Sequence, residues 1–381
     1  MLDVLLTASV AFIITFLAIP VIIQVAEQKK LYDIPDERKV HTRLVASLGG
    51  VAIFSGFLLA SLLSIQGYLN PEFQYFFAAA VVIFFLGLKD DIIILSASKK
   101  LIGQIIAASI LIHLGGIRID SMHGLLGFNE LPEGFALALS YLTIIVVINS
   151  FNLIDGVDGL AASLGILTMS VFGAYFFAID YQAYALLSFA MAGSLVAFMI
   201  FNHQPAKIFM GDSGSLMIGL INAILVIKFI NVAESPFVGV PVTSAVAVGF
   251  SILIVPLLDT LRVFSIRILK GRSPFTPDRN HVHHLLLDRG MSHAAVTLTC
   301  VGINIGFILL TWFGKELGPN YLLLIVLSIA FTGLGLLYYN RPRRRTMFIS
   351  KRKNGATELT TTSTKNKVVT LTKEAAAENN N

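Results

Sequence analysis

Charged residues are scarce in this sequence, and cysteine is nearly absent. Only 13% of the 381 residues are charged and 55% are hydrophobic, with a mean hydropathy of +0.79. Soluble domains carry about 25% charged residues, so this composition excludes a water-soluble fold. The single cysteine, Cys300, lies inside an apolar run. A disulfide framework, a cysteine-ligated zinc site and an iron–sulfur centre are therefore excluded, and we interpret Cys300 as a packing residue.

Long apolar runs recur along most of the chain. A membrane-spanning helix needs about 20 mostly apolar residues. Barrel strands would alternate apolar and polar residues, whereas runs such as 186–201 are apolar on nearly every face, so helices are predicted to cross the bilayer. The expected fold is an all-α integral membrane protein with about eleven transmembrane helices, at residues 3–25, 48–68, 73–88, 101–117, 135–151, 159–179, 182–201, 213–232, 238–258, 294–313 and 320–339.

Basic residues are distributed unevenly between alternate loops. Of the 28 lysines and arginines, all but Arg118, Lys228 and Lys315 fall in the loops of one side or in the C-terminal tail. Cytoplasmic loops are enriched in these residues, so the N-terminus is predicted outside and the C-terminus in the cytoplasm. Residues 1–25 lack the features of a cleavable signal peptide, and the first run is expected to stay as a helix.

Two parts of the chain differ in composition. We divide it into a polytopic membrane domain at 1–340 and a cytoplasmic tail at 341–381, which is basic at first and then predicted to be disordered. The basic start of the tail would attract anionic lipids. Since no nucleic-acid-binding module accompanies it, no nucleic-acid partner is expected.

Acidic side chains gather at the predicted cytoplasmic ends of the spans. A carboxylate at membrane depth costs up to about 3 kcal/mol and usually marks a functional site. Adjacent carboxylates can bind a metal, or one can act as a base while a cation holds the other ionised; a solvated loop turn is the structural alternative for the adjacent pair. So many acids at one face indicate a divalent cation, and they are Asp90, Asp91, Asp155, Asp158, Asp212 and Asp259.

The segment 149–159 interrupts an apolar stretch with two Asp-Gly pairs. Glycine permits the left-handed backbone of a tight turn. The amide and acid side chains of this segment recur every three residues, close to one helical face, at Asn149, Asn152, Asp155 and Asp158. The spacing differs from that of an EF-hand. A helix-capping turn is the alternative to a binding segment.

A third polar group runs through residues 201–215 and leads into the next apolar run. We predict that Asp212 or Ser213 caps the following helix, whose positive N-terminal end favours a nearby phosphate. The sequence Gly-Asp-Ser-Gly is also similar to the nucleophile segment of serine proteases, which would pair Ser213 with a histidine such as His203. That alternative is disfavoured because the serine would be buried at a helix start.

The predicted loop 259–293 is rich in arginine and histidine. Arginine forks suit diphosphate oxygens, and histidine can donate to phosphate or move a proton near neutral pH. Two alternatives are a transition-metal site, disfavoured by the hard oxygen ligands nearby, and a merely basic interfacial loop. The polar residues of this loop are Asp259, Arg262, Arg267, Arg272, Asp278, Arg279, His281, His283 and His284.

Together these groups resemble the polyprenyl-phosphate N-acetylhexosamine-1-phosphate transferase family along about residues 1–340. The order, spacing and topology of the motifs match. The resemblance rests on residues 38–41 with 47–50, the Asp90-Asp91 pair, 149–160, 206–215 and 273–284. Some relatives carry a third acid three residues after the pair, where this chain has Ile94, so no role is assigned there.

The resemblance implies transfer of a sugar-1-phosphate from a UDP-N-acetylhexosamine to undecaprenyl phosphate at the bacterial inner membrane. UMP would be released, and the product would start lipid-linked cell-envelope polysaccharide synthesis. Mg²⁺ is the implied cofactor, with Mn²⁺ as an alternative, and its ligands would be Asp212 and Asp158. The resemblance implies catalytic roles for Asp90, Asp91, Asp155, Asp158 and His281. Lys100 would contact the lipid phosphate, Arg267 and His281 would contact the diphosphate, and the uridine would be held by Asn152, Asn202 and Phe209. Further substrate contacts are implied for Asn149, Arg279, His283 and His284.

The 259–293 loop bears on the choice of sugar. Its histidine pattern resembles the branch that uses UDP-N-acetylglucosamine or a related N-acetylhexosamine, because Val282 interrupts the three successive histidines typical of the branch that uses UDP-N-acetylmuramoyl-pentapeptide. That second branch stays an alternative within the family. An ion-coupled transporter is the alternative from another class, although transporter sites tend to lie near the midplane. The oligomeric state is open, with a homodimer among the partners considered.

Overall fold

The computed structural model describes residues 1–29, 45–269, 271 and 281–339, and the backbone alone of four short strands, β1 (Tyr32–Asp33) and β5 to β7. Two compact units divide the chain, Met1–Leu336 and Leu337–Asn381. In the second unit, β5 (Phe348–Lys351), β6 (Thr357–Thr362) and β7 (Val368–Leu371) form an antiparallel sheet. The prediction of a disordered tail is therefore not confirmed.

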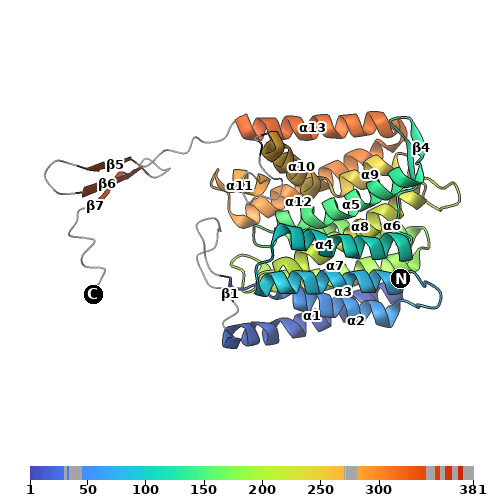
Figure 1. The fold of residues 1–381 in the computed structure, drawn as a ribbon, viewed down its shortest axis with the longest axis horizontal. Helices are drawn as coiled ribbons and strands as arrows, with labels where there is room; N and C mark the ends of the chain where they lie inside the picture. Colours follow the sequence, from blue (N-terminus) through green and yellow to red (C-terminus); the bar gives the residue numbers. More distant parts are fainter. Residues whose placement is uncertain are drawn as a thin grey trace. The chain divides into compact units, whose positions relative to one another are not determined.

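The first unit is a bundle of long helices that run side by side (Figure 1). Each predicted apolar run corresponds to a helix or to a pair of consecutive helices. These are α1 (Leu2–Lys29), α2 (Gly49–Ser64), α3 (Phe73–Ile92), α4 (Ala97–Ser109) continued by a π-helical turn (Ile110–Leu114), α5 (Glu133–Ile154), α6 (Leu160–Ala178), α7 (Gln182–Asn202), α8 (Gly211–Ala233), α9 (Ala245–Ile252) with α10 (Ile254–Leu269), α12 (His293–Phe313) and α13 (Pro319–Tyr339).

When the helices are judged by length and composition, fewer of them qualify as membrane spans than the number of apolar runs suggests. Within the described ranges, eight helices are long and apolar enough to cross a membrane, and the bent pair α9–α10 would make a ninth. Helix α2 has only 16 residues, which is short for a hydrocarbon core about 30 Å thick. A mostly helical membrane fold is thus confirmed, whereas the count of eleven spans stays a prediction.

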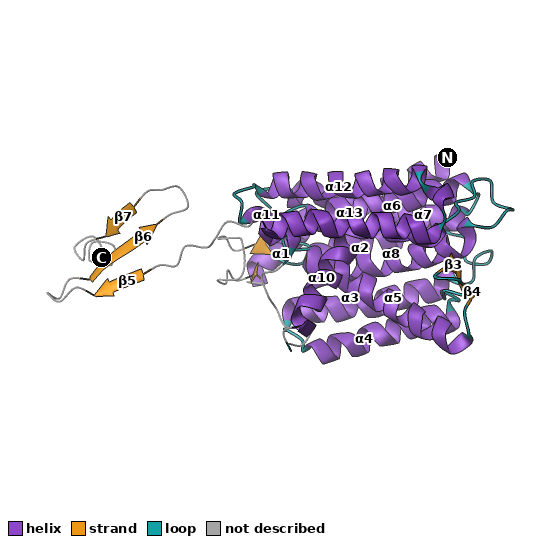
Figure 2. Ribbon diagram, turned by 90° about the horizontal axis from the view of Figure 1, so that it is seen from above, coloured by secondary structure: helices purple, strands orange, loops and turns teal. Residues whose placement is uncertain are grey.

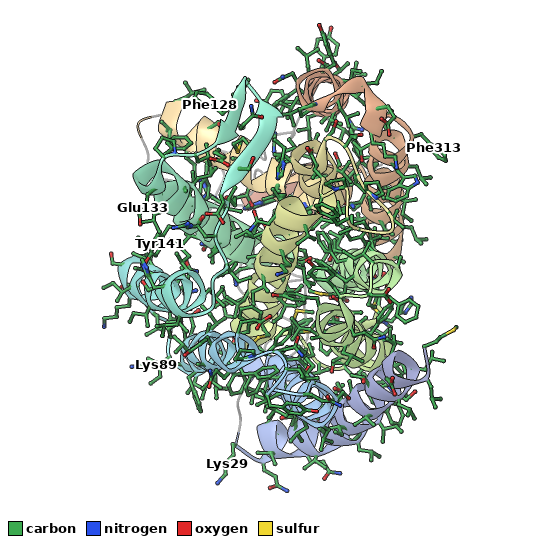
Figure 3. The ribbon with its side chains drawn as sticks, turned by 90° about the vertical axis from the view of Figure 1, so that its right-hand side faces the viewer. Lys29, Lys89, Phe128, Glu133, Tyr141 and Phe313 are labelled. Carbon is green, nitrogen blue, oxygen red and sulfur yellow. The ribbon has the colours of Figure 1, made fainter. Side chains whose placement is uncertain are left out.

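Helix α8 forms the middle of the bundle, as the view from above and the view along the helices show (Figures 2 and 3). In its most apolar stretch 89% of the residues are buried inside the protein, against 17% for α13 at the edge. Helices α2, α3, α5 and α6 all pack against α8. Because α8 is apolar on every face, burial on all sides is the arrangement that its sequence favours.

Two pairs of short antiparallel strands are formed between helices of the first unit. Strand β1 pairs with β2 (Val45–Ala46) just before α2, and β3 (Ser121–Leu125) pairs with β4 (Phe128–Glu130) between α4 and α5. Ala46 also forms an isolated bridge with Ile208, which ties the start of α2 to the segment before α8.

The ninth predicted run is broken rather than continuous. Helices α9 and α10 meet at an angle of 83° around Leu253. Asn304, buried in the middle of α12, satisfies the interrupted backbone: its Oδ1 accepts from Val255 N (3.2 Å) and its Nδ2 donates to the Ile252 carbonyl (2.9 Å). Helix α10 continues to Leu269, so part of the predicted 259–293 loop is helical, and α11 (Val282–Leu287) adds a short helix to it.

Replacing Asn304 by leucine should destabilise the fold. Two backbone groups at the break would lose their partners, and a buried group without one costs about 1–3 kcal/mol. We expect a loss of about 2 kcal/mol or more, seen as a lower unfolding temperature in detergent. The neighbouring Ile303→Leu, at a half-exposed position, is the control, and equal unfolding temperatures for the two variants would contradict the role of Asn304.

Candidate active site

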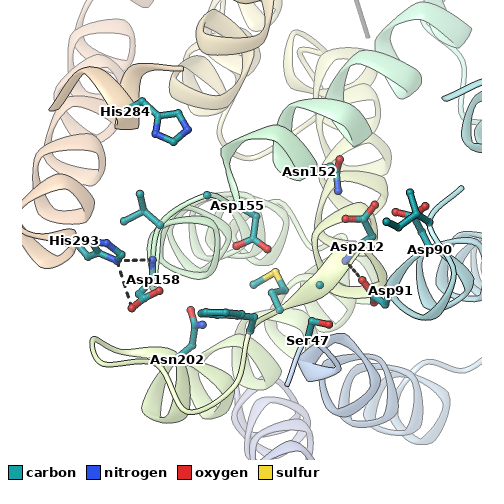
Figure 4. A pocket seen from close by; sticks show the side chains of 16 residues that line it. Ser47, Asp90, Asp91, Asn152, Asp155, Asp158, Asn202, Asp212, His284 and His293 are labelled. Atoms are coloured by element: carbon teal, nitrogen blue, oxygen red, sulfur yellow. Dashed lines mark hydrogen bonds and ion pairs between the residues drawn. The ribbon is translucent and has the colours of Figure 1, made fainter. Parts of the chain in front are cut away.

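A cavity of about 420 Å³ opens where α3, α5 and α7 end and α8 and α12 begin (Figure 4). The residues predicted for the site that line it are Asp90, Asp91, Asn152, Asp155, Asp158, Asn202, Phe209, Asp212 and His284. The predicted residues that are described but do not line it are Lys100, Asn149, Arg267, His281 and His283. Arg279 lies outside the described residues. Segments far apart in sequence thus meet at one end of the bundle, as the acidic pattern predicts.

Lys100 is the counter-ion of the acidic side chains. Its Nζ lies 2.6 Å from Asp90 Oδ2 and 2.6 Å from Asp212 Oδ2, and thereby links the end of α3 to the start of α8. Asp90 is fixed further because its Oδ1 accepts from Leu95 N (2.6 Å). The described contacts of Lys100 are with protein carboxylates, and its contact with a lipid phosphate stays a prediction.

Asp91, and not Asp212 or Ser213, caps helix α8. Its Oδ1 accepts from Asp212 N (2.6 Å), and its Oδ2 accepts from Ser213 N (3.1 Å) and Ser213 Oγ (2.6 Å). The predicted cap was therefore wrong: the capping carboxylate comes from α3, 121 residues earlier. This carboxylate already takes two amides at the positive end of α8, those of Asp212 and Ser213, so these two are not open to a phosphate.

Close backbone approach makes this cap attainable. Gly211 has a φ of +72°, which glycine adopts without strain, and a Cβ there would lie 2.7 Å from both carboxylate oxygens of Asp91. A Cβ at Gly87 of α3 would lie 2.5 Å from Ser213 Cα. Small residues at these two positions let α3 and α8 come close enough for the carboxylate to reach the helix start.

The serine-protease-like alternative is not supported by the contacts of Ser213. This residue is fully buried and donates its hydroxyl to Asp91. His203 is exposed, and its Nδ1 contacts the Gln204 carbonyl. A serine nucleophile needs a base within hydrogen-bond reach, and the described contacts give Ser213 a carboxylate as its acceptor.

The 149–159 segment is helical to Ile154 and then turns sharply into α6. Gly159 has a φ of +78°, as predicted for a tight turn. Asn202 holds this turn, since its Oδ1 accepts from Gly159 N (2.8 Å) and its Nδ2 donates to the Ile208 carbonyl (2.9 Å). Both ends of the Asn202 amide are thus engaged within the protein, and its contact with a uridine stays a prediction.

The two asparagines of the 149–159 segment, Asn149 and Asn152, differ in position. Asn149 exchanges hydrogen bonds with Gln104, 2.8 and 3.2 Å long, which join α4 to α5 outside the cavity. Asn152 lies in the wall of the cavity and donates to Ser215 Oγ (3.1 Å), beside Asp212. The geometry therefore puts Asn152 at the acidic end of the cavity.

Asp155 lies in the turn after α5 and faces the other acids. Its removal from water and the negative charges of Asp212, Asp91 and Asp158 raise its pKa to about 8. Burial disfavours the ionised form, and nearby like charges disfavour it further. A bound cation would reverse this balance, so the acidic end of the cavity is electrostatically suited to receive one.

Only one of the three histidines at 281–284 faces the cavity. His281 is buried and donates from Nδ1 to Asp259 Oδ2 (2.8 Å), while Asp259 Oδ1 accepts from Val282 N (2.7 Å). His283 is buried against Gly156, where a Cβ would come within 2.5 Å of its Nε2. Only His284 of the three lines the cavity. The prediction that His281 faces the diphosphate directly is therefore not borne out by the described cavity.

Arg267 also lies away from the cavity wall. It is 3% exposed, and its guanidinium lies 5.9 Å from the centre of the Phe264 ring. Its predicted contact with the diphosphate has no counterpart in the described cavity. The basic residues around 272–280 lie outside the described residues.

Two polar side chains of the cavity were not among the predicted site residues. Ser47 lines it from the segment before α2, and His293 lines it from the first turn of α12. His293 lies next to a predicted span that begins at residue 294, so its place at the same end as the acids could have been inferred. The contact between His293 and Asp158, with 3.4 Å between His293 Nδ1 and Asp158 Oδ2, could not have been inferred from the sequence.

The described residues include no cluster of three or more histidine, cysteine or acidic side chains placed to hold a metal ion by themselves. The alternative of a transition metal held by the histidines therefore has no support from them. A hard cation bound by one or two carboxylates, with substrate oxygens and water as its other ligands, needs no such cluster.

Protonation of His283 should make the fold sensitive to acid. Burial lowers the pKa of His283 to about 3, against about 6.5 in an unfolded chain. The stability that this neutral ring contributes is present above pH 6.5 and is lost as the pH falls toward 3. We expect wild type to lose about 1.4 kcal/mol more than His283→Gln between pH 7.5 and 5.5. Unfolding in detergent at both pH values measures this, with the exposed His203→Gln as control, and an equal loss in all three proteins would contradict it.

Comparison with known proteins assigns the family. Residues 73–230 match the model described as glycosyl transferase family 4. A probable undecaprenyl-phosphate N-acetylglucosaminyl 1-phosphate transferase of Bacillus subtilis is 33% identical over 308 residues, which cover 78% of this chain and 82% of the relative. A decaprenyl-phosphate N-acetylglucosaminephosphotransferase of Mycobacterium leprae is 33% identical over 318 residues, with 78% and 80% covered. An undecaprenyl-phosphate alpha-N-acetylglucosaminyl 1-phosphate transferase of Yersinia pestis is 28% identical over 315 residues, with 81% and 84% covered.

The matches to the relatives cover about four fifths of the chain, and the family model covers the ends of α3, α5 and α7 and the start of α8. The resemblance inferred from the motifs is thereby confirmed. The chain is an enzyme of the phosphotransferase class, and it belongs to glycosyl transferase family 4, among the polyprenyl-phosphate N-acetylhexosamine-1-phosphate transferases.

Proposed function

We propose that this protein transfers N-acetylglucosamine-1-phosphate, or a related N-acetylhexosamine-1-phosphate, from a UDP-sugar to undecaprenyl phosphate and releases UMP. The observation that supports this most is the convergence of Asp90, Asp155 and Asp212 with Lys100 at one end of a membrane bundle. The polyprenyl phosphate and the sugar are those in the names of the relatives. The cavity would face the cytoplasm, because that side carries the excess of lysine and arginine.

The donor set of the cavity fits Mg²⁺. Asp212 and Asp158 supply hard carboxylate oxygens, and a cationic group, the Lys100 ammonium, already lies between two of the carboxylates. Mg²⁺ prefers oxygen ligands and binds through one or two carboxylates together with substrate phosphates. Asp212, with Asp158, would hold the ion, which would neutralise the charge of the diphosphate.

Lipid and nucleotide would enter the cavity from different sides. Ile94 lines the cavity and is also 94% exposed, and the adjacent Ile93 is 61% exposed, so the end beside Asp90 offers an apolar approach for a prenyl chain. An ammonium has three N–H donors, and Lys100 uses two of them on Asp90 and Asp212. Lys100 contacts two wall residues without forming the wall itself, and we propose that its third N–H donates to an oxygen of the lipid phosphate.

The reaction needs orientation more than acid–base chemistry. A lipid phosphate already has a charged oxygen near neutral pH, and it can attack the sugar-bearing phosphorus in line, with UMP as the leaving group. We therefore favour direct displacement over a phospho-aspartate intermediate. In this scheme Asp91 acts by holding Asp212 in place through the start of α8.

Two alternatives predict different substrates. A phospho-N-acetylmuramoyl-pentapeptide transferase would share the cavity and differ in the donor. An ion-coupled transporter would need acids near the middle of its spans, whereas Asp90 and Asp212 lie at the ends of α3 and α8. The structure therefore favours the enzyme over the transporter.

The function is tested by measuring UMP release from the purified protein in detergent, across a panel of UDP-sugars. We expect release that requires both undecaprenyl phosphate and Mg²⁺, with UDP-N-acetylglucosamine or a related UDP-N-acetylhexosamine as the best donor. Turnover of UDP-N-acetylmuramoyl-pentapeptide alone would support the other branch. Absence of release with every donor, from a folded protein, would contradict the proposal.

Asp212→Asn should abolish most of the Mg²⁺-dependent turnover. Loss of the carboxylate removes a metal ligand, and we expect kcat to fall about a hundredfold or more, while the protein stays folded with some loss of stability from the weakened Lys100 contact. Asp180→Asn, the same change at an exposed turn, is the control. Near-normal activity of Asp212→Asn would remove this residue from the metal site.

A further inference from the structure

His293 lies in the wall of the cavity and has no role in the reaction as described above. It is the first residue of α12 and shares the wall with Asp158 and His284. The helix begins in a well-formed turn, because the side chain of the N-cap Ser292 accepts from Ala295 N (3.2 Å). The imidazole thus projects from a rigid element, which suits a side chain that holds a ligand.

One ring nitrogen of His293 is used within the protein. Its Nδ1 accepts a hydrogen bond from the backbone nitrogen of Asp158, at 3.3 Å. In the tautomer in which Nδ1 accepts this hydrogen bond, the ring proton is on Nε2; Nδ1 also lies 3.4 Å from Asp158 Oδ2. Thr297, one turn further along α12, donates to the Asp158 carbonyl (3.3 Å). The start of α12 and the turn after α5 are therefore held together, and the ring is fixed between them.

The other ring nitrogen is left for a ligand. Among the residues that the structure describes, no partner is found for His293 Nε2. The side chain is 14% exposed and lines the cavity, so an N–H donor on a fixed ring borders the space in which a substrate would lie. Figure 4 shows His293 and Asp90 on opposite sides of that space.

Position within the cavity indicates which substrate the donor meets. The Asp90 side adjoins the exposed Ile94, from which a prenyl chain would approach. On the His293 side the wall residue in contact with the ring is Asp158. The apolar Val157 of the same turn also lines the cavity, but it is only 4% exposed, against 94% for Ile94. A nucleoside diphosphate sugar presents many oxygen acceptors, which match N–H donors from histidine. The polar side therefore suits the nucleotide-sugar, and the apolar side suits the lipid.

We propose that His293 is a binding residue for the nucleotide-sugar donor, and that its Nε2–H group donates a hydrogen bond to an oxygen of that ligand. This inference rests on the proposed function, because it assumes that the cavity holds a nucleoside diphosphate sugar. His293 would then have two separable contacts: Nδ1 to the Asp158 backbone and Nε2 to the substrate.

Two substitutions separate the contacts. In His293→Asn the amide oxygen takes the place of Nδ1, so the contact with Asp158 is kept and the donor to the substrate is lost. In His293→Gln the amide nitrogen takes the place of Nε2, so the donor is kept and the contact with Asp158 is lost. Both residues are tolerated in the first turn of a helix. Ser292→Ala, which removes the N-cap outside the cavity, is the control for a general weakening of α12.

The probes are UDP-N-acetylglucosamine and undecaprenyl phosphate, with binding of the first measured by calorimetry in detergent and the KM of each measured in the UMP assay. We expect His293→Asn to weaken binding and raise the KM of the UDP-sugar about tenfold, the effect of one lost hydrogen bond. His293→Gln should stay within about threefold of wild type. The KM of undecaprenyl phosphate should be unchanged in both variants.

Other outcomes would overturn the inference. A larger loss in His293→Gln than in His293→Asn would show that His293 acts only by positioning Asp158. A raised KM for the lipid with unchanged UDP-sugar binding would assign the donor to the other substrate. If wild type turns over the UDP-sugar and neither variant differs from it, the inference fails while the proposed function stands. If wild type neither binds nor uses any UDP-sugar, the proposed function itself fails.

Discussion

The contact between the end of α3 and the start of α8 is the constraint on which the candidate site depends. Asp91 caps α8 with three hydrogen bonds, and Lys100 links Asp90 to Asp212. Without the lysine, two carboxylates would face each other at a membrane boundary, where an unpaired charge is costly. Without the cap, the start of the most buried helix would have unpaired amides. The groups that bring α3 and α8 together are therefore also the groups that orient the acids.

A second set of contacts holds the opposite wall of the cavity. The bend between α9 and α10, satisfied by Asn304, brings Asp259 to the buried ring of His281. Helix α12 then contacts the turn after α5 through His293 and Thr297. These particular polar groups are paired across helices, which suits a setting without water at membrane depth, and the contacts of α12 hold the turn that carries Asp155 and Asp158.

The sequence predicted the positions of the helices and the gathering of the acidic residues well. It predicted poorly which side chains contact one another across helices. Apolar runs located α7 and α8 to within two residues, because hydropathy reports burial in lipid or core. The charge bias placed the acids at a common end. The break at Leu253 was missed because apolar residues continue through it, and the cap of α8 by Asp91 was missed because it joins segments 121 residues apart. Neither periodicity nor local capping rules contain such long-range contacts.

The central claim is that a sugar phosphate, and not a sugar alone, moves to the lipid. The most direct measurement uses UDP-N-acetylglucosamine labelled with radioactive phosphorus only in the sugar-bearing phosphate, with undecaprenyl phosphate and Mg²⁺. Attack on that phosphorus predicts that the label appears in the lipid product and that the released UMP is unlabelled. Label retained in a released UDP, with an unlabelled lipid, would contradict the account, because it would show transfer of the sugar without its phosphate.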